Sequence, residues 1–505
     1  MAEATGQPDP RAELARALTG VFSWAQEVDA ASSRGNEVVA LVRGALGEQG
    51  LGRSVVSRDL PPFEQVNLQV ALDAWSAQPG RSVAVHGLAL PPHFSGVSLQ
   101  QLLHGDGLPP LRLSAPDLVD LPSGPGRTVA CLRRALLLVQ DARGSYVLLV
   151  RGPEPHQEPT LGVEVAGLST DDAQAVLGEL AELRAELNVY RGQVLELRRG
   201  QTGLEVVFPV LPVTRREDVV LPEAVLRRVE RHTVDIADRR QALRDAGQHL
   251  KRGLLLHDPP GTGKTHTTRY VVQRLAGSTV LMLTGQALRL IGPVTGLARD
   301  LQPAVIVLED VDLVAEDRGY GPGPSPVLFE LLDAMDGAAA DADLLFLLTT
   351  NRADLLEPSL AARPGRVDVA VEVGLPDADA RRRLFEVYSR GVPLQVGADQ
   401  VDAVVDRTAG VTASFVKELL RRAVLEALAE QDGPLLVVTG EHLTRALDDL
   451  LDSTQSVTRA LLGVPDEGSG PPAADGPAEG RGAGGHGGFG WASPGLAPGS
   501  GFPPG

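Results

Sequence analysis

A short segment at residues 258–265 has the residue types and spacing of a phosphate-binding loop. It reads Asp-Pro-Pro-Gly-Thr-Gly-Lys-Thr. Gly261 and Gly263 allow the backbone to turn sharply and to point its N–H groups at phosphate oxygens. Lys264 can then reach the β- and γ-phosphates, and the hydroxyl of Thr265 can bind Mg²⁺. The segment therefore predicts a nucleotide site for ATP and Mg²⁺.

The residues on both sides of this loop predict the elements that hold it. The apolar run 253–256 before it predicts a strand, and a helix is expected from about Thr265 to Leu275. The positive N-terminus of that helix would face the same anion. The predicted nucleotide-binding residues are Asp258, Pro259, Pro260, Gly261, Thr262, Gly263, Lys264, Thr265 and His266.

The first residue of the loop departs from the usual pattern. The motif G-x-x-x-x-G-K-[ST] starts with glycine, whereas this sequence has Asp258. A carboxylate beside a triphosphate repels it unless the carboxylate points away or bonds to nearby backbone N–H groups. We expect nucleotide binding to survive, and Asp258 to affect its strength and the rate of turnover.

A second run, 305–308, supplies the other half of a hydrolytic site. Val-Ile-Val-Leu is a continuous apolar strand of the kind buried in a parallel sheet, and Glu309 and Asp310 follow it. One carboxylate can hold Mg²⁺ together with Thr265, and the next can polarise an attacking water. Glu309 is therefore the predicted second metal ligand and Asp310 the predicted base. A plain charged cap at the strand end is the competing interpretation.

Composition limits the classes of partner. The 505 residues carry a net charge of -18, which argues against general nucleic-acid binding because phosphate contacts need clustered Lys and Arg. The single cysteine, Cys131, is expected to be a buried apolar residue. The first six residues lack the features of a secretory signal, and no run is long enough to span a membrane. We expect a cytoplasmic protein without a membrane partner.

The chain divides into five predicted regions. Residues 1–165 form a mixed α+β region that could bind a client or partner; it opens with a helical pattern at 8–50 and contains a hairpin, 135–139 with 146–150. Residues 166–219 predict a long helix and linker, 220–375 a nucleotide-binding domain and 376–463 a helical lid. The lid helices are expected at 381–390, 412–430 and 440–451. The Gly- and Pro-rich tail, 464–505, is expected to be disordered.

The long helix has two interpretations. It begins near Ser169 or Thr170, and apolar residues recur at alternating spacings of four and three: Val176, Leu180, Leu183, Leu187, Tyr190, Val194 and Leu197. Such a seam can pack on its own domain or form a short coiled coil between subunits. Gly192 weakens the last part, and Val194 onward is alternatively a strand.

Residues from about 250 to 375 resemble the classical branch of the AAA (AAA+) ATPases. Residues 259–265 match the Walker A sequence of that family. Glu309-Asp310 stands at its Walker B position with the usual Asp-Glu order inverted, as in AAA proteins similar to the mitochondrial Rieske-protein translocase. Residues 331–337 resemble the helix and Asp-Gly turn that follow, 347–352 the sensor-1 strand, and 410–415 a lid sequence.

The resemblance implies a fold, a set of catalytic residues and an assembly. The expected fold is an α/β P-loop domain, a parallel sheet with helices on both faces, followed by a small helical lid. The implied catalytic residues are Glu309, Asp310, Asn351, Arg363 and Arg366, the two arginines reaching the nucleotide of a neighbouring subunit. Because these arginines act on a neighbouring subunit, the resemblance also implies self-association into a ring, which is expected to be a hexamer. In the loop that faces the central pore, Leu290 or Ile291 stands where the family has an aromatic residue.

Three functions stay open at this stage. The first is a ring-forming, Mg-dependent ATPase that remodels or translocates a protein client. The second is a nucleotide-gated scaffold with little turnover, suggested by Asp258 and the Glu-Asp order. The third is a DNA-directed motor. Its support would be the densest basic segment, which consists of Arg227, Arg228, Arg231, Arg239 and Arg240, but acidic residues interrupt that segment.

Overall fold

The structure is a computed structural model of the 505-residue chain. The described residues are 20, 36–90, 96–104, 108–109, 111–153, 160–200, 203–315, 330, 333–337, 342–352, 367–430 and 436–452. The predicted early helical stretch up to residue 35 lies outside this set apart from residue 20, and the predicted tail lies wholly outside it. No helix among the described residues combines the length and the apolar character that a membrane crossing requires.

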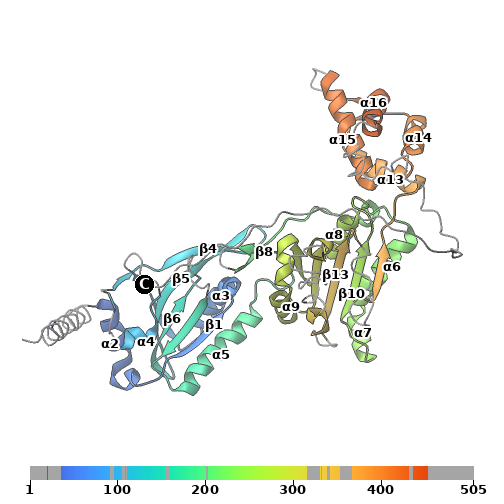
Figure 1. The fold of residues 1–505 in the computed structure, drawn as a ribbon. Helices are drawn as coiled ribbons and strands as arrows, with labels where there is room; N and C mark the ends of the chain where they lie inside the picture. The colour runs from blue at the N-terminus through green and yellow to red at the C-terminus, as the bar shows by residue number, and fades with distance from the viewer. Residues whose placement is uncertain are drawn as a thin grey trace, which may run out of the picture. The chain divides into compact units, whose positions relative to one another are not determined.

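The N-terminal region is built on an antiparallel sheet. The strand order is β1-β7-β6-β5-β2-β3, and β4 pairs with the first part of the long strand β5. The strands are β1 Val56–Leu60, β2 Ser82–Ala89, β3 Arg112–Ser114, β4 Asp117–Gly124, β5 Arg127–Asp141, β6 Gly144–Arg151 and β7 Leu161–Ala166. The helices are α2 Glu37–Leu51, α3 Gln65–Ser76, α4 Leu99–His104 and α5 Thr170–Glu186, with the 3₁₀ turn η1 Pro62–Glu64 (Figure 1).

Both faces of this sheet are buried at its centre, along β6 and the second half of β5, which explains the unbroken apolar runs there. Leu137 and Leu148 pack with α3 and α5, whereas their neighbours Leu136 and Leu149 pack with α2 and α4. Successive strand residues point to opposite faces, so a strand covered on both sides must be apolar at every position. The predicted hairpin is confirmed: β5 and β6 pair antiparallel from Arg134↔Arg151 to Asp141↔Gly144.

The predicted heptad seam is wrong beyond residue 186. Helix α5 starts as expected, with the Ser169 side chain capping the N–H of Asp172, but it ends at Glu186. Val176 and Leu180 pack into the core of their own domain. Val194 and Leu197 instead belong to strand β8, so the alternative interpretation of Val194 onward as a strand is confirmed.

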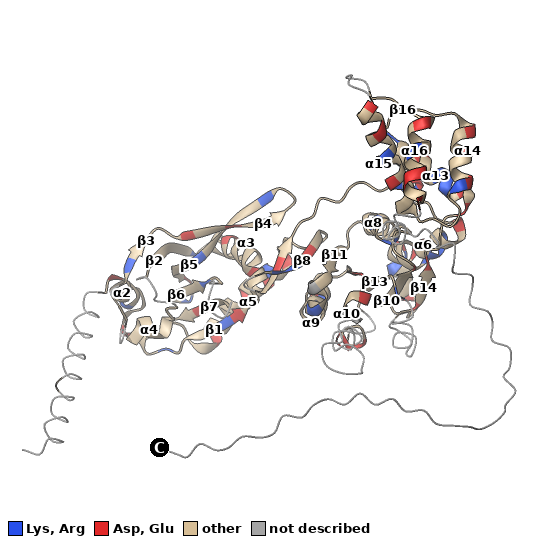
Figure 2. Cartoon of the chain, turned by 45° about the horizontal axis from the view of Figure 1, so that its top comes forward, with Lys and Arg blue, Asp and Glu red and all other residues tan. Residues whose placement is uncertain are grey.

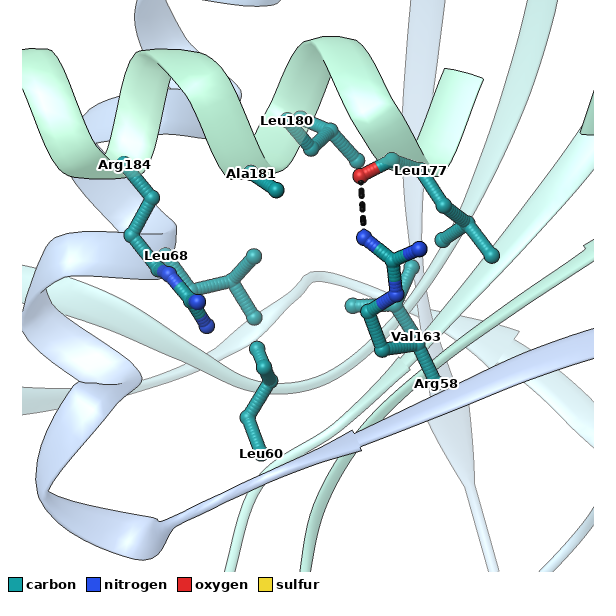
Figure 3. A pocket seen from close by; sticks show the side chains of 8 residues that line it. All are labelled: Arg58, Leu60, Leu68, Val163, Leu177, Leu180, Ala181 and Arg184. Atoms are coloured by element: carbon teal, nitrogen blue, oxygen red, sulfur yellow. Dashed lines mark hydrogen bonds between the residues drawn. The ribbon is translucent and has the colours of Figure 1, made fainter. Parts of the chain in front are cut away.

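Beneath α5 lies a small cavity of about 10 Å³ (Figure 3). Its apolar lining comes from strands β1 and β7 and from helices α3 and α5, and the Arg58 guanidinium donates to the carbonyl oxygen of Leu177 at 2.8 Å. A volume of this size is about that of a single water-sized sphere. It is therefore a packing gap rather than a ligand site.

An ion network ties the β5–β6 hairpin to helix α5. Arg81 stacks on the Trp75 ring, 3.8 Å from its centroid, and pairs with Asp141 at 3.3 Å and with Glu179 at 3.0 Å. The Tyr146 hydroxyl donates to Asp141 at 2.8 Å. The Asp141 side chain is only 7% exposed, so its charge is matched by partners that are themselves held by packing.

The second sheet is the core of the nucleotide-binding region. Its order is β14-β10-β13-β12-β11-β8-β9, parallel from β14 through β8, with β9 antiparallel at the edge. The strands are β8 Val194–Gly200, β9 Gly203–Val207, β10 Arg252–His257, β11 Thr279–Thr284, β12 Ala304–Glu309, β13 Leu344–Thr350 and β14 Val369–Glu372. The hairpin β8–β9 therefore adds two strands from before residue 220, the predicted start of this domain.

Helices cover both faces of this sheet. The long helices are α6 Glu223–Asp238, α8 Lys264–Arg274 and α9 Ile291–Asp300; α7 Arg240–Asp245, α10 Asp312–Ala315 and the 3₁₀ turns η2 Arg216–Asp218 and η3 Gly285–Leu290 are short. Leu254, Val307 and Leu347 pack with α6 and α8, while Ile306 and Phe346 face α9. This is the expected parallel sheet between two layers of helices.

The last region is a helical lid. It contains α13 Ala378–Ser389, α14 Ala398–Arg407, α15 Ala413–Glu430 and α16 Gly440–Leu451, with a two-stranded ladder of β15 Leu394–Gln395 and β16 Val438–Thr439. Three of these helices agree with the predicted ranges. The sequence analysis missed α14, whose short apolar face contributes only Val404 and Val405 as buried residues.

Candidate nucleotide site

The loop 258–265 joins the end of strand β10 to the start of helix α8. Gly261 has φ +84° and Gly263 has φ +110°, a region that side chains with a Cβ rarely adopt. A Cβ on Gly263 would meet nothing within 4 Å. Glycine is therefore required at these positions by backbone conformation, and helix α8 begins directly at Lys264 with its free N–H groups turned to the loop.

Lys264 lies inside the loop. It is 6% exposed, and its Nζ donates to the carbonyl oxygens of Asp258 at 2.7 Å and Pro259 at 2.9 Å. Burial lowers the pKa of Lys264, while the carboxylates of Asp258, Asp310 and Asp312 act in the opposite direction. The ammonium group is thus held near the strand ends that carry the acidic residues.

Asp258 lies half-buried where the motif usually has glycine. Its Oδ2 is buried and accepts no hydrogen bond from any residue in the described part of the chain. Burial, followed by the charge of Glu372, raises the pKa of Asp258 to about 6, whereas Lys264 and His257 lower it. Bonds from local backbone N–H groups, one of the two arrangements that would relieve the repulsion of a phosphate, are therefore absent at Oδ2 among the described residues.

Glu309 ends strand β12, two strands away from β10. Burial raises its pKa, the neighbouring Asp310 raises it further, and Arg269 lowers it. Its Oε1 is buried without a hydrogen-bond partner among the described residues. An unpartnered buried carboxylate oxygen is costly unless a cation or donor joins it.

Asp310 has an unusual backbone conformation, φ +53°. It is the one residue other than glycine with positive φ in the ranges that the structure describes, and aspartate is among the residues that tolerate this region. Its N–H donates to Thr349 Oγ1 at 3.0 Å, and its Oδ1 accepts the side-chain amide of Asn351 at 3.2 Å. The structure therefore brings together the predicted base and the predicted sensor residue.

Asp312 is a site residue that the sequence analysis did not single out. It is 5% exposed, and its Oδ1 accepts from the hydroxyl of Thr350 and from the N–H of Asn351, both at 3.0 Å. It thus fixes the end of β13 against the end of β12. Its place as the last acid of Glu-Asp-Val-Asp was the signal available in the sequence.

The lid contacts the loop at the start of helix α15. The N–H of Ser414 donates to the carbonyl oxygen of Gly261 at 3.0 Å, and a Cβ on Gly261 would stand 2.9 Å from Ser414 Oγ. His266 meets the carbonyl oxygen of Asp218 at 3.2 Å through Nε2, and burial lowers the pKa of His266. Asp218 in turn pairs with Arg390 of the lid.

The structure describes only some of the remaining predicted residues. Arg363 and Arg366 lie outside the described residues. Of the two residues at the pore-loop position, Ile291 is 1% exposed in the sheet core, whereas Leu290 is only partly buried against the same cluster, so a role of Leu290 in a pore loop stays a prediction. The 3₁₀ turn η3 and the start of α9 fold these aliphatic side chains inward.

The described residues fit a nucleotide with a divalent cation. Left-handed glycines and the start of α8 form the anion-binding part, and Lys264 supplies the positive charge. Thr265 and Glu309 would hold the cation, since hard oxygen ligands suit Mg²⁺. Within the described ranges, no three His, Cys, Asp or Glu side chains cluster to bind a metal by themselves. Mg²⁺ commonly takes one or two protein ligands, with phosphate and water completing its shell.

Three of the five arginines in the basic segment 227–240 pair with acidic side chains. Arg227 pairs with Glu230 at 3.5 Å, Arg239 with Asp235 at 3.6 Å, and Arg240 with Asp343 at 3.2 Å. Figure 2 shows the same mixture on the lid, where acidic and basic stretches alternate along the helices. These pairs favour a solvated helix face over a nucleic-acid contact.

Comparison with known proteins gives matches in the same region. Residues 254–375 match the family described as ATPase family associated with various cellular activities (AAA). An ATP-dependent zinc metalloprotease FtsH of Mycobacterium tuberculosis is 30% identical over 313 residues, covering 57% of this chain and 40% of that protein. FtsH 2 of Sphaerobacter thermophilus is 32% identical over 265 residues, 50% of this chain and 39% of its own length.

The chain thus spans less than half the length of these relatives. None of its ten histidines begins the His-Glu-x-x-His pattern of a zinc protease helix, so the zinc-protease part of that name stays with the relatives. The matched segment holds β10 through β14 with the loop 258–265, Glu309, Asp310 and Asn351. Residues 254–375 therefore form an α/β P-loop domain of the AAA ATPase type.

Proposed function

We propose that this chain binds Mg·ATP in the loop 258–265 and hydrolyses it to remodel or translocate a protein client. The observation that carries the proposal is the placement of Lys264, Asp310 and Asn351 at one edge of the sheet, with Asn351 hydrogen-bonded to Asp310. They follow strands β10, β12 and β13, which are neighbours in the sheet, and the carboxyl ends of parallel strands share one edge.

Each residue has a distinct chemical role in this proposal. Lys264 binds phosphate oxygens when they displace the loop carbonyls from its Nζ. Asp310 orients and polarises the attacking water, and Asn351 holds the Asp310 carboxylate in place. Thr265 and Glu309 hold Mg²⁺, which when bound neutralises charge on the β- and γ-phosphate oxygens.

The assembly is part of the proposal. By the family resemblance, Arg363 and Arg366 reach the nucleotide of a neighbouring subunit in a ring, expected to be a hexamer, and an arginine supplied in this way raises phosphoryl-transfer rates by orders of magnitude. The N-terminal region recruits the client, whose identity stays open. Because Leu290 or Ile291 stands where the family has a pore-loop aromatic residue, a folded client is as open as an extended one.

Phosphate release from Mg·ATP tests the shared site. Wild-type protein should turn over, and Lys264→Ala and Arg366→Ala should each be inactive. Mixing those two inactive proteins should restore part of the activity, because an intact loop then meets an intact arginine. Turnover that is unchanged in both Arg363→Ala and Arg366→Ala would remove the arginines from the site.

A nucleotide-gated scaffold is the second candidate, favoured by one observation. The Nζ of Lys264 is engaged by the carbonyl oxygens of its own loop, beside the unpartnered Asp258. Such a loop would bind nucleotide slowly and seldom release phosphate. Phosphate release no faster than that of Asp310→Asn protein would favour the scaffold, whereas a rate well above it would favour the ATPase.

A further inference from the structure

Asp258 occupies the first position of the phosphate loop, where a glycine would carry no charge. We propose that Asp258 takes up a proton when the nucleotide binds, so that affinity for the triphosphate rises as the pH falls. This inference rests on the proposed function, since it concerns the same site. It makes Asp258 an affinity-setting residue of the loop rather than a neutral replacement for glycine.

The surroundings of Asp258 disfavour its charged form. The Oδ2 atom is buried and has no hydrogen-bond donor among the described residues. Strand β14 brings a second carboxylate nearby, since Glu372 is the register partner of His257, the residue before Asp258. Burial and the nearby like charge therefore both disfavour the ionised form of Asp258.

The positive groups near Asp258 compensate only in part. Lys264 of α8 donates its hydrogen bonds to the backbone oxygens of Asp258 and Pro259 rather than to the carboxylate. Asp310 and Asp312, from the end of β12, also draw on the charge of Lys264. With His257 on β10, these groups leave the pKa of Asp258 raised to about 6, so at neutral pH it is mostly charged but close to its titration range.

Phosphates bound in this loop would shift the protonation equilibrium of Asp258 towards its neutral form. A triphosphate brings several negative charges to the N–H groups of residues 261–265 and to Lys264, so it offsets the positive charge of Lys264 that favours the ionised Asp258 and adds repulsion. Both effects raise the pKa of Asp258 in the complex. The complex therefore binds more protons than the free protein, and linkage requires the affinity to increase as pH falls.

The pKa of Asp258 in the nucleotide-free protein determines the pH range over which the affinity changes. Below about pH 6 Asp258 is already protonated in the free protein, so affinity becomes independent of pH. Above that value each binding event takes up as much as one proton, which limits the change in affinity to about tenfold per pH unit. Glu372→Gln removes a like charge, so it should move the window to lower pH.

Isothermal titration calorimetry of the full chain with the β,γ-imido analogue of ATP and excess Mg²⁺ tests the proposal. Titrations at pH 6, 7 and 8 in buffers of different ionisation enthalpy report the protons taken up. Asp258→Asn keeps the shape of the side chain, and Asp258→Gly restores the usual residue. Protonation of the ATP analogue itself contributes equally to the wild-type and variant titrations, so it cancels in the comparison. Wild-type protein should take up about half a proton or more at pH 7 beyond these variants.

The outcomes separate the two proposals. In the Asp258 variants the affinity should be higher at pH 8 and nearly flat between pH 6 and 8. Equal proton uptake by wild-type protein and Asp258→Asn would overturn the coupling while leaving nucleotide binding intact. No binding by wild-type protein or by Asp258→Gly at any pH would instead overturn the proposed nucleotide site.

Discussion

Asn351 donates its side-chain amide to the carboxylate of Asp310 across the ends of two adjacent strands, at 3.2 Å. The contact joins β13 to β12, and it fixes a carboxylate whose backbone already has an uncommon φ of +53°. A base can activate water only when its orientation is held, because small displacements cost large factors in rate. The Asp310–Asn351 pair is therefore the central geometric element of the proposed hydrolytic site.

Replacement of Asn351 should slow turnover more than it weakens binding. In Asn351→Ala the Asp310 carboxylate loses its donor, so we expect kcat to fall on the order of ten- to a hundredfold. Affinity for the imido analogue of ATP should change by less than about threefold, because Lys264 and the loop are untouched. Phosphate-release kinetics and calorimetry check the two values. A similar loss in both would mean that Asn351 mainly binds nucleotide.

Asp312 should contribute to stability as well as to the site. Removal of its carboxylate in Asp312→Ala leaves the N–H of Asn351 and the hydroxyl of Thr350 without a buried acceptor, at a cost of about 1–3 kcal/mol. Urea unfolding followed by circular dichroism measures the change. The exposed Asp300 provides a control, since Asp300→Ala should alter stability by less than about 0.5 kcal/mol. Equal effects of the two substitutions would contradict the role of Asp312.

A side chain on Gly261 should disturb both the loop and its contact with the lid. Alanine at this position must adopt φ +84°, which costs about 1–2 kcal/mol, and its Cβ would press on Ser414. We expect Gly261→Ala to weaken binding of the imido analogue about tenfold. Adding Ser414→Gly removes the closest contact but leaves Thr412 Oγ1 at 3.1 Å and the backbone strain, so it should restore only part of the affinity. Full restoration would show that the strain is unimportant.

The N-terminal region should lose stability in acid through Asp141. Burial raises the pKa of Asp141, but hydrogen bonds from the Arg143 backbone, Tyr146 and Arg81, with the Arg143 charge, lower it more, so its folded pKa is below normal. Such a carboxylate stabilises the fold above its unfolded pKa, about 3.9, and the contribution disappears as pH falls through the folded value.

Asp141→Asn should therefore be less stable than the parent at pH 7, and the gap should close below about pH 4. Thermal unfolding followed by tryptophan fluorescence checks this in a Trp24→Phe, Trp491→Phe background. That background leaves Trp75, which packs beside Tyr146 and Arg81, as the reporter. A gap that stays constant from pH 7 to pH 3 would exclude the ionised carboxylate as its source.

The sequence predicted those parts of the fold that local pattern determines. The apolar runs that became β10 and β12, the loop glycines and the β5–β6 hairpin all carry their signal within a few residues. Lys264, Glu309 and Asp310 were found because their spacing from a strand end is fixed by the fold they belong to. Asn351 needed the additional resemblance, since an Asn after a strand has no distinctive pattern of its own.

The remaining features depend on contacts between distant segments. The acceptor role of Asp312 is visible only when β13 lies beside β12, and the contact of Ser414 with Gly261 joins residues far apart in the chain. The heptad seam failed because Val194 and Leu197 satisfy the helical spacing by coincidence while facing a sheet core. The burial of Ile291 depends on the 3₁₀ turn η3 and the start of α9, which the apolar residue types alone do not predict.

The pairing of β8 with β11 has a consequence for how this chain can be divided. Val194–Leu197 run beside Val280–Leu283, so the ATPase sheet takes one of its inner neighbours from a segment that precedes every nucleotide motif. A fragment starting at residue 220 would leave the N–H and C=O groups along one edge of β11 unpaired. Such an exposed edge strand promotes aggregation. The smallest transplantable ATPase unit therefore starts before Val194, and exchanging the N-terminal region between proteins would have to preserve this shared hairpin.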